Sequence, residues 1–371
     1  MARLLAAGAA NAPDGAGELR ILCRIFDSVK FTGFARSGRF RDKACLPEPK
    51  SGLLYLSFRE RTANLPKLRI SIVQYLNTAP LVWGFTNGPL RGKYELSFTV
   101  PSLCAEALRS RAADIAIIPA IEYQRMGDLV ILPDMAIASQ NQVRSLLIIS
   151  KMPIEEARSI ALDSSSRSTQ ALTKILCHRW WKIAPEFLET PPDAVAMLHG
   201  ADSALLIGDP ALRLSIEIQD SAKRGAAGEQ VSSGNDAGIP DAGTVHVYDV
   251  VEEWRKMTNL PAVLAVWAAR SEVVNAEVIE DFQMSRDFGL QNVEEISQRA
   301  ARDLHLPAGE LKRYLTENID FRLGEENLRG LTAYFRFAST LGLIPQMNTM
   351  AIAAARNKPL RYVDFAMAKE R

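Results

Sequence analysis

The sequence predicts an α/β protein with two compact lobes. The chain has 371 residues, of which 47% are hydrophobic and 23% charged, and this is an ordinary composition for a globular protein of two-lobe length. From Leu68 onward, short runs of β-branched residues alternate with stretches of helical periodicity. Such alternation is typical of strands separated by helices in an α/β fold.

The predicted elements follow this alternation along the chain. Six strands are predicted at residues 69–73, 96–100, 114–118, 145–149, 159–162 and 203–207. A helix is predicted at 248–257, with Trp254 facing inward, and a buried strand at 262–268. Beyond Ser271 the chain becomes mostly helical, with helices predicted at 273–290, 293–304, 308–315 and 325–341.

Two segments depart from the regular pattern. Residues 1–66 carry Gly and Ala clusters with little periodicity, so we predict a poorly ordered N-terminal extension there. Residues 219–244 are rich in Gly, Ser, Ala and Asp, which bury too little apolar area to order a segment. We predict an irregular surface insertion at this point.

The composition argues against several classes of function. A formal net charge of +1 provides no general field for nucleic acid. No stretch approaches the roughly 20 apolar residues of a membrane helix, and residues 1–10 contain too short an apolar segment for a secretory signal, so we expect a cytoplasmic protein. The cysteines lack metal-type spacing, and no Gly-rich phosphate loop follows a strand, so no metal or nucleotide cofactor is predicted. No feature indicates an oligomeric state.

A single amide stands where the first predicted strand gives way to a helix. Thr78 is placed to be the helix N-cap, and Pro80 falls in the first helical turn. Asn77 is therefore left at the mouth of the helix, where polar side chains of an α/β sheet face a cleft. Asn77 and Thr78 are candidate ligand contacts, although closing a turn is the commoner role of an asparagine.

The strongest chemical feature lies between residues 161 and 172, where a strand ends in hydroxyl-rich positions and a helix begins. The first turn of a helix leaves N–H groups unpaired and carries partial positive charge, so it can bind a carboxylate. Arg167 can add a bidentate contact to that carboxylate or form a salt bridge that braces the turn. The other candidate ligand contacts here are Ser165, Ser166, Ser168 and Thr169.

Three further polar residues lie near strand ends. The hydroxyl of Ser145, beside an apolar strand, needs a partner or a ligand. Asp209 is either a helix N-cap or an acid, a base or a ligand contact. Glu122 suits a helix N-terminus better than the role of a base. The four histidines fall away from the strand ends, so any catalysis is expected to rest on positioning and electrostatic stabilisation.

In combination and order, these motifs resemble the chorismate dehydratases of the futalosine route to menaquinone. The likeness runs from about residue 68 to residue 345. It rests on residues 75–78, 100–102, 114–119, 122–123, 164–169, 207–209, 253–258, 264–270 and 319–324. The sequence departs from the family in residues 1–66, in the insertion, and at Asn259, where Gly is common.

The resemblance implies a type II periplasmic-binding-protein-like fold, in which a hinge of two crossing segments joins two α/β lobes around a central cleft. On this chain, lobe one would comprise residues 68–150 with 262–345, and lobe two residues 151–261. The crossings would lie near 149–152 and 260–263, and residues 346–371 would form a C-terminal tail.

The resemblance also implies a reaction, the conversion of chorismate to 3-enolpyruvylbenzoate and water without a cofactor. The family associates the positions of Asn77 and Ser145 with the ligand, and the cluster at 164–169 with its carboxylate. The proton acceptor would be the enolpyruvyl carboxylate of the substrate, with Asn77 orienting the groups, and Asp209 would be the fallback base. The alternatives are a non-catalytic binding protein for small carboxylates, which the missing secretory signal disfavours, and the dihydroxynaphthoate-forming enzyme of the same pathway, which residues 75–78 disfavour.

Overall fold

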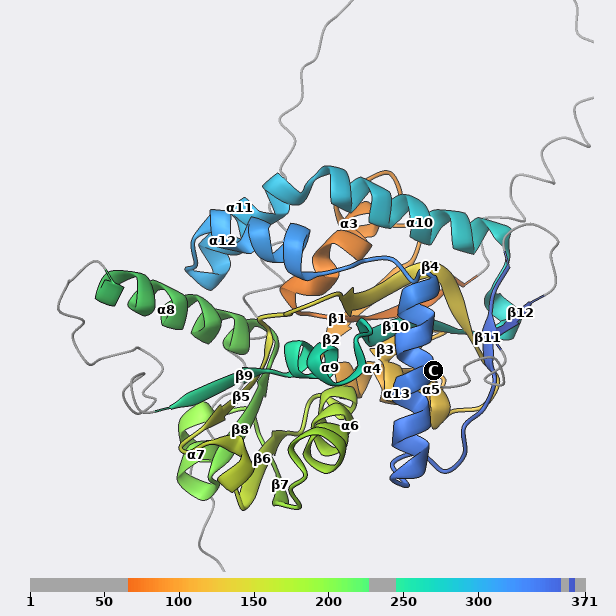
Figure 1. Cartoon of the computed structure of the whole chain (residues 1–371). Helices are drawn as coiled ribbons and strands as arrows, with labels where there is room; N and C mark the ends of the chain where they lie inside the picture. Colours follow the sequence, from red (N-terminus) through yellow and green to blue (C-terminus); the bar gives the residue numbers. More distant parts are fainter. Residues whose placement is uncertain (1–65, 227–244, 355–359, 364–371) are drawn as a thin grey trace, which may run out of the picture. The chain divides into compact units, whose positions relative to one another are not determined.

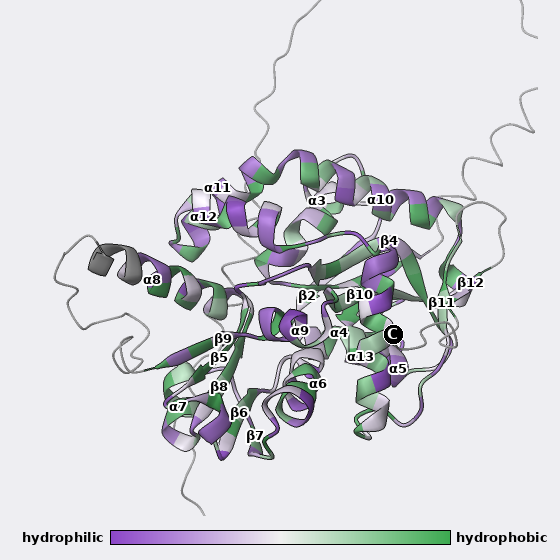
Figure 2. Ribbon diagram, viewed as in Figure 1, coloured by the Kyte–Doolittle hydropathy of each residue, from purple (hydrophilic) through white to green (hydrophobic). Residues whose placement is uncertain are grey.

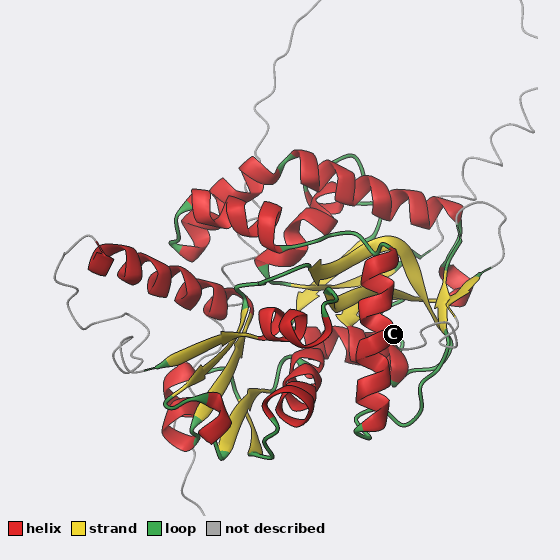
Figure 3. Cartoon of the chain, in the orientation of Figure 1, coloured by secondary structure: helices red, strands yellow, loops and turns green. Residues whose placement is uncertain are grey.

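The computed structural model describes residues 66–226, 245–354 and 360–363 (Figure 1). Residues 1–65 of the predicted N-terminal extension and residues 227–244 of the predicted insertion lie outside these ranges. Within them, the strands form two separate sheets with helices around both (Figure 3). No helix in the described ranges has both the length and the apolar character to cross a bilayer.

The larger sheet has seven strands in the order β12-β11-β4-β10-β3-β1-β2. Its first three strands along the chain are parallel, and β10 runs antiparallel between β3 and β4. Loops that follow β1, β3 and β4 therefore leave the sheet at one edge, where ligands of α/β sheets bind. The strands are β1 (Arg69–Val73), β2 (Glu95–Thr99), β3 (Ile115–Pro119), β4 (Leu129–Ser139), β10 (Ala262–Arg270), β11 (Met350–Ile352) and β12 (Arg361–Val363).

The smaller sheet has five strands in the order β7-β6-β8-β5-β9. These are β5 (Leu146–Ser150), β6 (Ser159–Asp163), β7 (Glu186–Thr190), β8 (Ser203–Ile207) and β9 (His246–Asp249). Strand β8 is parallel to β6 and antiparallel to β5, with Leu146 paired to Ile207. The residue before β5 therefore lies at the sheet edge where β6 and β8 end, and this register brings Ser145 close to Asp209.

The point at which the chain first passes between the sheets differs from the prediction. We expected a crossing near 149–152, but β5 pairs with β8 and β9 and belongs to the smaller sheet. The chain thus leaves the larger sheet at Ser139 and enters the smaller one at Leu146. A strand that is buried at every position carries no alternating pattern that shows which sheet it joins, and this explains the error.

Two predicted segment boundaries also change. The helix α8 (Gly208–Ala226) continues into the first residues of the predicted insertion at 219–244. The predicted C-terminal tail at 346–371 contains β11, which pairs in parallel with β4, and β12, which pairs with β11. Residues 355–359 and 364–371 lie outside the described ranges.

Helices pack on both sheets and against one another. They are α3 (Ala79–Thr86), α4 (Pro101–Arg109), α5 (Ala120–Gln124), α6 (Arg167–Leu176), α7 (Ala194–Gly200), α8, α9 (Val250–Thr258), α10 (Ala276–Gln291), α11 (Val293–Leu304), α12 (Ala308–Arg313) and α13 (Glu325–Thr340). Helix α10 lies along α3, and α13 contacts β10, α5 and α6 (Figure 1). Hydrophobic residues dominate the strands, while polar residues gather on the helices (Figure 2).

Close packing fixes α3 and the loop before it on the larger sheet. A Cβ atom on Gly289 of α10 would lie 1.9 Å from the carbonyl oxygen of Pro80, so only glycine fits at this contact. Nearby, the ring of Phe282 meets Phe85 and Trp267 edge-on, with centroid distances of 4.9 and 4.8 Å. The start of α3 is thereby held in place, and Asn77 with it.

Candidate active site

The loop between β1 and α3 carries Asn77 on a short 3-10 turn, η1 (Leu76–Thr78). Helix α3 begins at Ala79 with Pro80 in its first turn, as predicted. Thr78 stands at the N-cap position, but its hydroxyl makes no capping bond and instead donates to Asn77 Oδ1 at 3.4 Å. Thr78 is buried, whereas Asn77 is partly exposed.

Tyr314 joins Asn77 to Ser145. Its hydroxyl donates to Ser145 Oγ at 2.9 Å, and the Asn77 side chain lies near the same hydroxyl. Burial raises the pKa of Tyr314 above its ordinary value, and the bonds to Ser145 and Asn77 oppose this shift only in part. The phenol is therefore neutral near pH 7. It sits on a π-helical turn, η5 (Tyr314–Asn318), a rare geometry that often marks functional sites.

Asp209 lies at the start of α8, close to the same cluster. Its Oδ1 accepts the backbone N–H of Leu76 at 3.1 Å, so the carboxylate contacts the loop that carries Asn77. Burial raises the pKa of Asp209 to about 6, against the opposing effects of the Leu76 N–H and the charge of Arg213. A carboxyl group with this pKa can exchange a proton near neutral pH.

Gly208 allows the two sheets to approach at this point. Its φ of +69° lies in the left-handed region, and a Cβ atom would lie 2.9 Å from the ring of Tyr75. The N–H of Gly208 donates to the carbonyl oxygen of Ser145 at 2.8 Å. Residues 75–77, Ser145 and Asp209 are thus connected through direct contacts at the facing edges of the two sheets.

The second strand–helix junction, between β6 and α6, brings together the predicted hydroxyl cluster. Ser166 Oγ and Thr169 Oγ1 form a hydrogen bond at 2.8 Å. Ser165 donates its N–H and its hydroxyl to Asp163 Oδ1 at 2.9 and 2.6 Å. Ser168 Oγ accepts the N–H of Ile121 at 3.1 Å. Two of the four hydroxyls thus stabilise the protein itself, while the bonded pair of Ser166 and Thr169 can exchange partners at the start of α6.

Arg167 forms the bracing salt bridge that the sequence left as one of two alternatives. Its Nη1 lies 3.1 Å from Glu122 Oε2, and the fully buried Glu122 also binds Arg125 at 2.8 Å and Arg109. Burial opposes the charge of Glu122, but the hydrogen bonds from Arg125 and Arg109 and the charge of Arg167 outweigh it, so the pKa lies below its usual value. Glu122 is therefore an anchor for arginines and is unsuited to act as a base.

Several bonds connect the second junction to the larger sheet. The N–H of Ser102 donates to the carbonyl oxygen of Ser165 at 3.0 Å, and the hydroxyls of Tyr75 and Ser165 lie 3.5 Å apart. The hydroxyl of Tyr334 donates to the carbonyl oxygen of Ser168 at 2.9 Å. Tyr75, which lies in the first junction, therefore contacts Gly208 at the start of α8 and Ser165 of the second junction.

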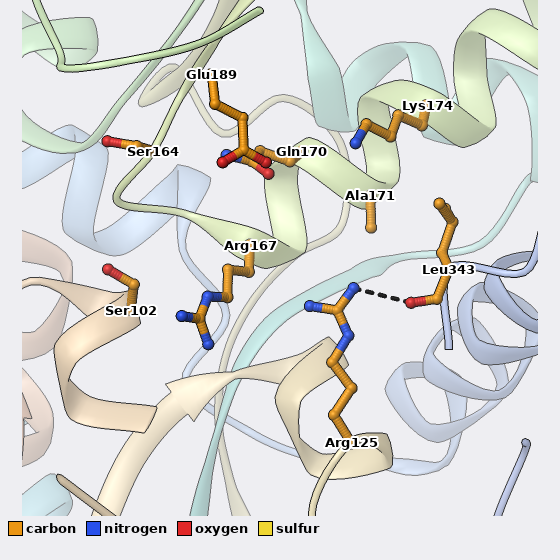
Figure 4. A pocket seen from close by; sticks show the side chains of 9 residues that line it. All are labelled: Ser102, Arg125, Ser164, Arg167, Gln170, Ala171, Lys174, Glu189 and Leu343. Carbon is orange, nitrogen blue, oxygen red and sulfur yellow. Dashed lines mark hydrogen bonds between the residues drawn. The ribbon is translucent and has the colours of Figure 1, made fainter. Parts of the chain in front are cut away.

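A polar cavity of about 240 Å³ lies beside α6 (Figure 4). We call it the outer cavity, and its polar lining includes Ser102, Arg125, Ser164, Arg167, Lys174 and Glu189. Apart from Arg167 and the neighbouring Ser164, no residue predicted for the site lines it. The outer cavity is thus distinct from the cluster around Tyr314.

The described residues contain no group of three or more His, Cys, Asp and Glu side chains that could hold a metal ion. The described cysteines, Cys104 and Cys177, are buried and unpaired. No histidine takes part in the contacts given above for the two junctions.

Comparison with known proteins places the chain among biosynthetic proteins. Residues 68–340 match the family described as menaquinone biosynthesis. The chain belongs to this family. A chorismate dehydratase from Thermus thermophilus is 28% identical over 276 residues, which cover 74% of this chain and 95% of the relative. The resemblance read from the sequence is confirmed at the level of the family.

Solved structures confirm the fold predicted for this member of the menaquinone biosynthesis family. Protein AF1704 from Archaeoglobus fulgidus matches with a TM-score of 0.57 at 19% identity, covering 75% of this chain and 98% of that one. The periplasmic aliphatic sulphonate binding protein SsuA from Escherichia coli matches with a TM-score of 0.50 at 15% identity, covering 80% and 97%. The fold is periplasmic-binding-protein-like.

Tyr314 belongs to the candidate site but was not predicted from the sequence. The residue lies far from the other junctions along the chain, within a stretch that reads only as a helix end. Tyr75 belonged to a recognised motif, but its contacts with Gly208 and Ser165 could not be inferred. The available signal was a polar aromatic residue at an apolar helical position, which is too common to single out.

Proposed function

We propose that the protein is a chorismate dehydratase, which eliminates water from chorismate to give 3-enolpyruvylbenzoate. Family membership and the Thermus thermophilus relative support this activity. The observation that carries the proposal is the convergence of the Asn77 loop, the hydrogen-bonded pair of Ser145 and Tyr314, and Asp209 at the facing edges of the two sheets. These neutral donors and a single carboxyl group suit a small acid that must be oriented and deprotonated.

The chemistry needs donors at the ring carboxylate. Loss of the ring hydroxyl and the neighbouring ring hydrogen makes the ring aromatic, which drives the reaction. The ring carboxylate acidifies that hydrogen through the conjugated double bond, so groups that stabilise negative charge on the carboxylate lower the barrier. The first-turn N–H groups of α6, with the hydroxyls of Ser166 and Thr169, are suited to this role.

Two groups can accept the proton. Asp209, with a pKa of about 6, is mostly ionised at pH 7 and lies next to the Asn77 loop. The enolpyruvyl carboxylate of the substrate is the other acceptor, with the amide of Asn77 holding it in position. The two differ in one consequence, because an Asp209→Asn variant would lose turnover only if Asp209 takes the proton.

The test is an incubation of the purified full-length protein with chorismate, without added metal or coenzyme. We expect stoichiometric formation of 3-enolpyruvylbenzoate, followed by chromatography and mass spectrometry, and no formation above background with Asn77→Ala. Chorismate that binds in calorimetry but stays unchanged would instead support a carboxylate-binding protein. Failure to bind chorismate at all would overturn the proposal.

A further inference from the structure

The outer cavity collects positive charge that the proposed reaction does not use. Arg125, Arg167 and Lys174 point into the same space (Figure 4), with Glu189 as the carboxylate of the lining. Arg167 and Lys174 lie seven residues apart on α6 and therefore share one helix face. Arg125 ends α5, on the side of the larger sheet.

The guanidinium groups of Arg125 and Arg167 are held in place by one buried carboxylate, which does not line the cavity. Glu122, fully buried, accepts Nη1 of Arg125 at 2.8 Å and Nη1 of Arg167 at 3.1 Å. Nη2 of Arg125 also donates to the carbonyl oxygen of Leu343 at 2.8 Å. Because these contacts already restrict both side chains, a ligand loses less entropy when it engages their remaining N–H groups.

Lys174 adds a charge without an acidic partner. Its ammonium lies 5.3 Å from the ring centroid of Phe187, and it forms no ion pair with a residue that the structure describes. Other lysines, such as Lys93 and Lys256, have a carboxylate within 3.2 Å. Within the outer cavity, the positive groups therefore exceed the negative ones.

We propose that the outer cavity binds a small molecule carrying a carboxylate or phosphate group, at a site separate from the Asn77 cluster. The anion lies between Arg167 and Lys174 of α6 and Arg125 at the C-cap of α5, and it takes further hydrogen bonds from Ser102 and Ser164 at the cavity wall. Helix α5 follows strand β3 of the larger sheet, and helix α6 follows strand β6 of the smaller sheet. The bound anion therefore contacts residues next to both sheets and stabilises the association of the two sheets.

Lys174→Gln is the sharpest test of this site. Substitution of Arg125 or Arg167 would remove an ion-pair partner of the buried Glu122 and destabilise the fold. Lys174 forms no ion pair with a described residue, so its substitution leaves Glu122 unaffected. Lys182→Gln is the matched control, because it makes the same change at an exposed lysine that does not line the cavity. Lys174→Arg keeps the charge and should restore binding.

The measurement is the melting temperature of the full chain titrated separately with inorganic phosphate and with succinate, each against sodium chloride of equal ionic strength. We expect a saturable rise beyond the chloride control in the wild type, in Lys182→Gln, in Lys174→Arg and in Asn77→Ala. In Lys174→Gln the midpoint should shift to roughly tenfold higher concentration, as expected for the loss of one charge-assisted hydrogen bond.

The two titrations identify the ligand class, since a response to phosphate alone indicates a phosphate ester and a response to succinate alone a dicarboxylate. A wild-type response equal to that of chloride would overturn the site, as would an unchanged midpoint in Lys174→Gln. Neither result depends on chorismate turnover. Asn77→Ala removes the amide proposed for the reaction but leaves the lining of the outer cavity unchanged, so its melting temperature should respond to the anion as the wild type does.

Discussion

The two strand–helix junctions look alike in sequence but use their polar residues differently. At both, a buried strand ends, polar residues follow, and a helix starts without a side-chain capping bond. At the first junction the amide of Asn77 stays partly exposed and lies near the phenol of Tyr314. At the second, Ser165 and Ser168 are engaged within the protein. A hydroxyl-rich run can therefore serve to hold two halves together, while a single amide remains available for a ligand.

This difference suggests a division of work between the junctions. The first, with Ser145 and Asp209, carries the groups that can orient a substrate and exchange its proton. The second offers helix N–H groups and one exchangeable hydroxyl pair, which suit the binding of a carboxylate. Substitutions of Asn77, Ser145 or Asp209 should lower kcat, whereas substitutions of Ser165 or Ser168, which are engaged within the protein, should act on KM and stability.

The largest effect is expected from Asn77→Ala. Removal of one preorganised hydrogen-bond donor from a reacting centre costs about 100- to 1000-fold in kcat. We predict a loss of at least about 100-fold in chorismate turnover, with an unchanged far-UV circular dichroism spectrum. Near-normal product formation would remove Asn77 from the mechanism.

Asp209→Asn tests the choice of proton acceptor through the pH dependence of kcat. If Asp209 takes the proton, the wild-type kcat rises with pH through about 6, where this carboxyl ionises, and the variant loses both that limb and most of its rate. A variant with wild-type kcat and profile would assign the proton to the enolpyruvyl carboxylate of the substrate.

The carboxyl group of Asp209 also makes the stability of the fold depend on pH in a defined direction. The pKa of Asp209 is about 6 in the folded chain against an ordinary value of 3.8, so the native state holds the proton more tightly. Its contribution is fully present below about pH 4 and is lost as the pH rises through 6. Asp249, with a similar pKa, adds the same slope. In urea unfolding, the decline in stability from pH 5 to 7.5 should be shallower in Asp209→Asn.

Tyr314→Phe and Tyr334→Phe form a matched pair, because each removes one hydroxyl from a buried tyrosine. Tyr314 donates to the Ser145 hydroxyl and Tyr334 to the Ser168 carbonyl. Loss of one hydrogen bond costs about 1 kcal/mol in either case. We predict that kcat falls about tenfold in Tyr314→Phe, the equivalent of about 1.4 kcal/mol, whereas Tyr334→Phe lowers the unfolding free energy and leaves kcat near wild type. Equal effects on kcat would contradict the division of work.

The smallest of the functional effects is expected from Ser168→Ala. The substitution leaves the buried N–H of Ile121 without its acceptor, at a cost of about 1 to 3 kcal/mol. Because this bond joins α5 to α6, we predict a lower melting temperature and a higher KM with little change in kcat. A fall in kcat comparable to that of Asn77→Ala would show that Ser168 acts on the reacting atoms.

The sequence predicted much of the regular structure. The seven predicted strands are confirmed within two residues at each end, because their runs of β-branched and other apolar residues suit positions in the two sheets. The strand β4 was missed because Pro133 and Asp134 interrupt it, and its register with β10 is irregular. The strand β9 was also missed, since Tyr248 and its neighbours were assigned to the start of α9.

The candidate site was predictable only where its residues lie next to strand ends. Asn77, Ser145 and Asp209 could be identified because polar residues next to strand ends in an α/β sheet face a common cleft. Tyr314 could not, because its position depends on how the C-terminal helices pack. The sequence also could not show that the hydroxyls of Ser165 and Ser168 are engaged within the protein. Their hydrogen bonds to Asp163 and Ile121 form only in the folded chain.

The central claim is that the ligand binds between the two sheets, against Asn77 and Ser145. A crystal structure of the full-length protein with 3-enolpyruvylbenzoate tests it most directly. We predict an oxygen of the ligand within hydrogen-bonding distance of both side chains, and a carboxylate at the start of α6 beside Ser166 and Thr169. Ligand found only in the outer cavity, with Asn77 and Ser145 making no contact to it, would contradict the claim.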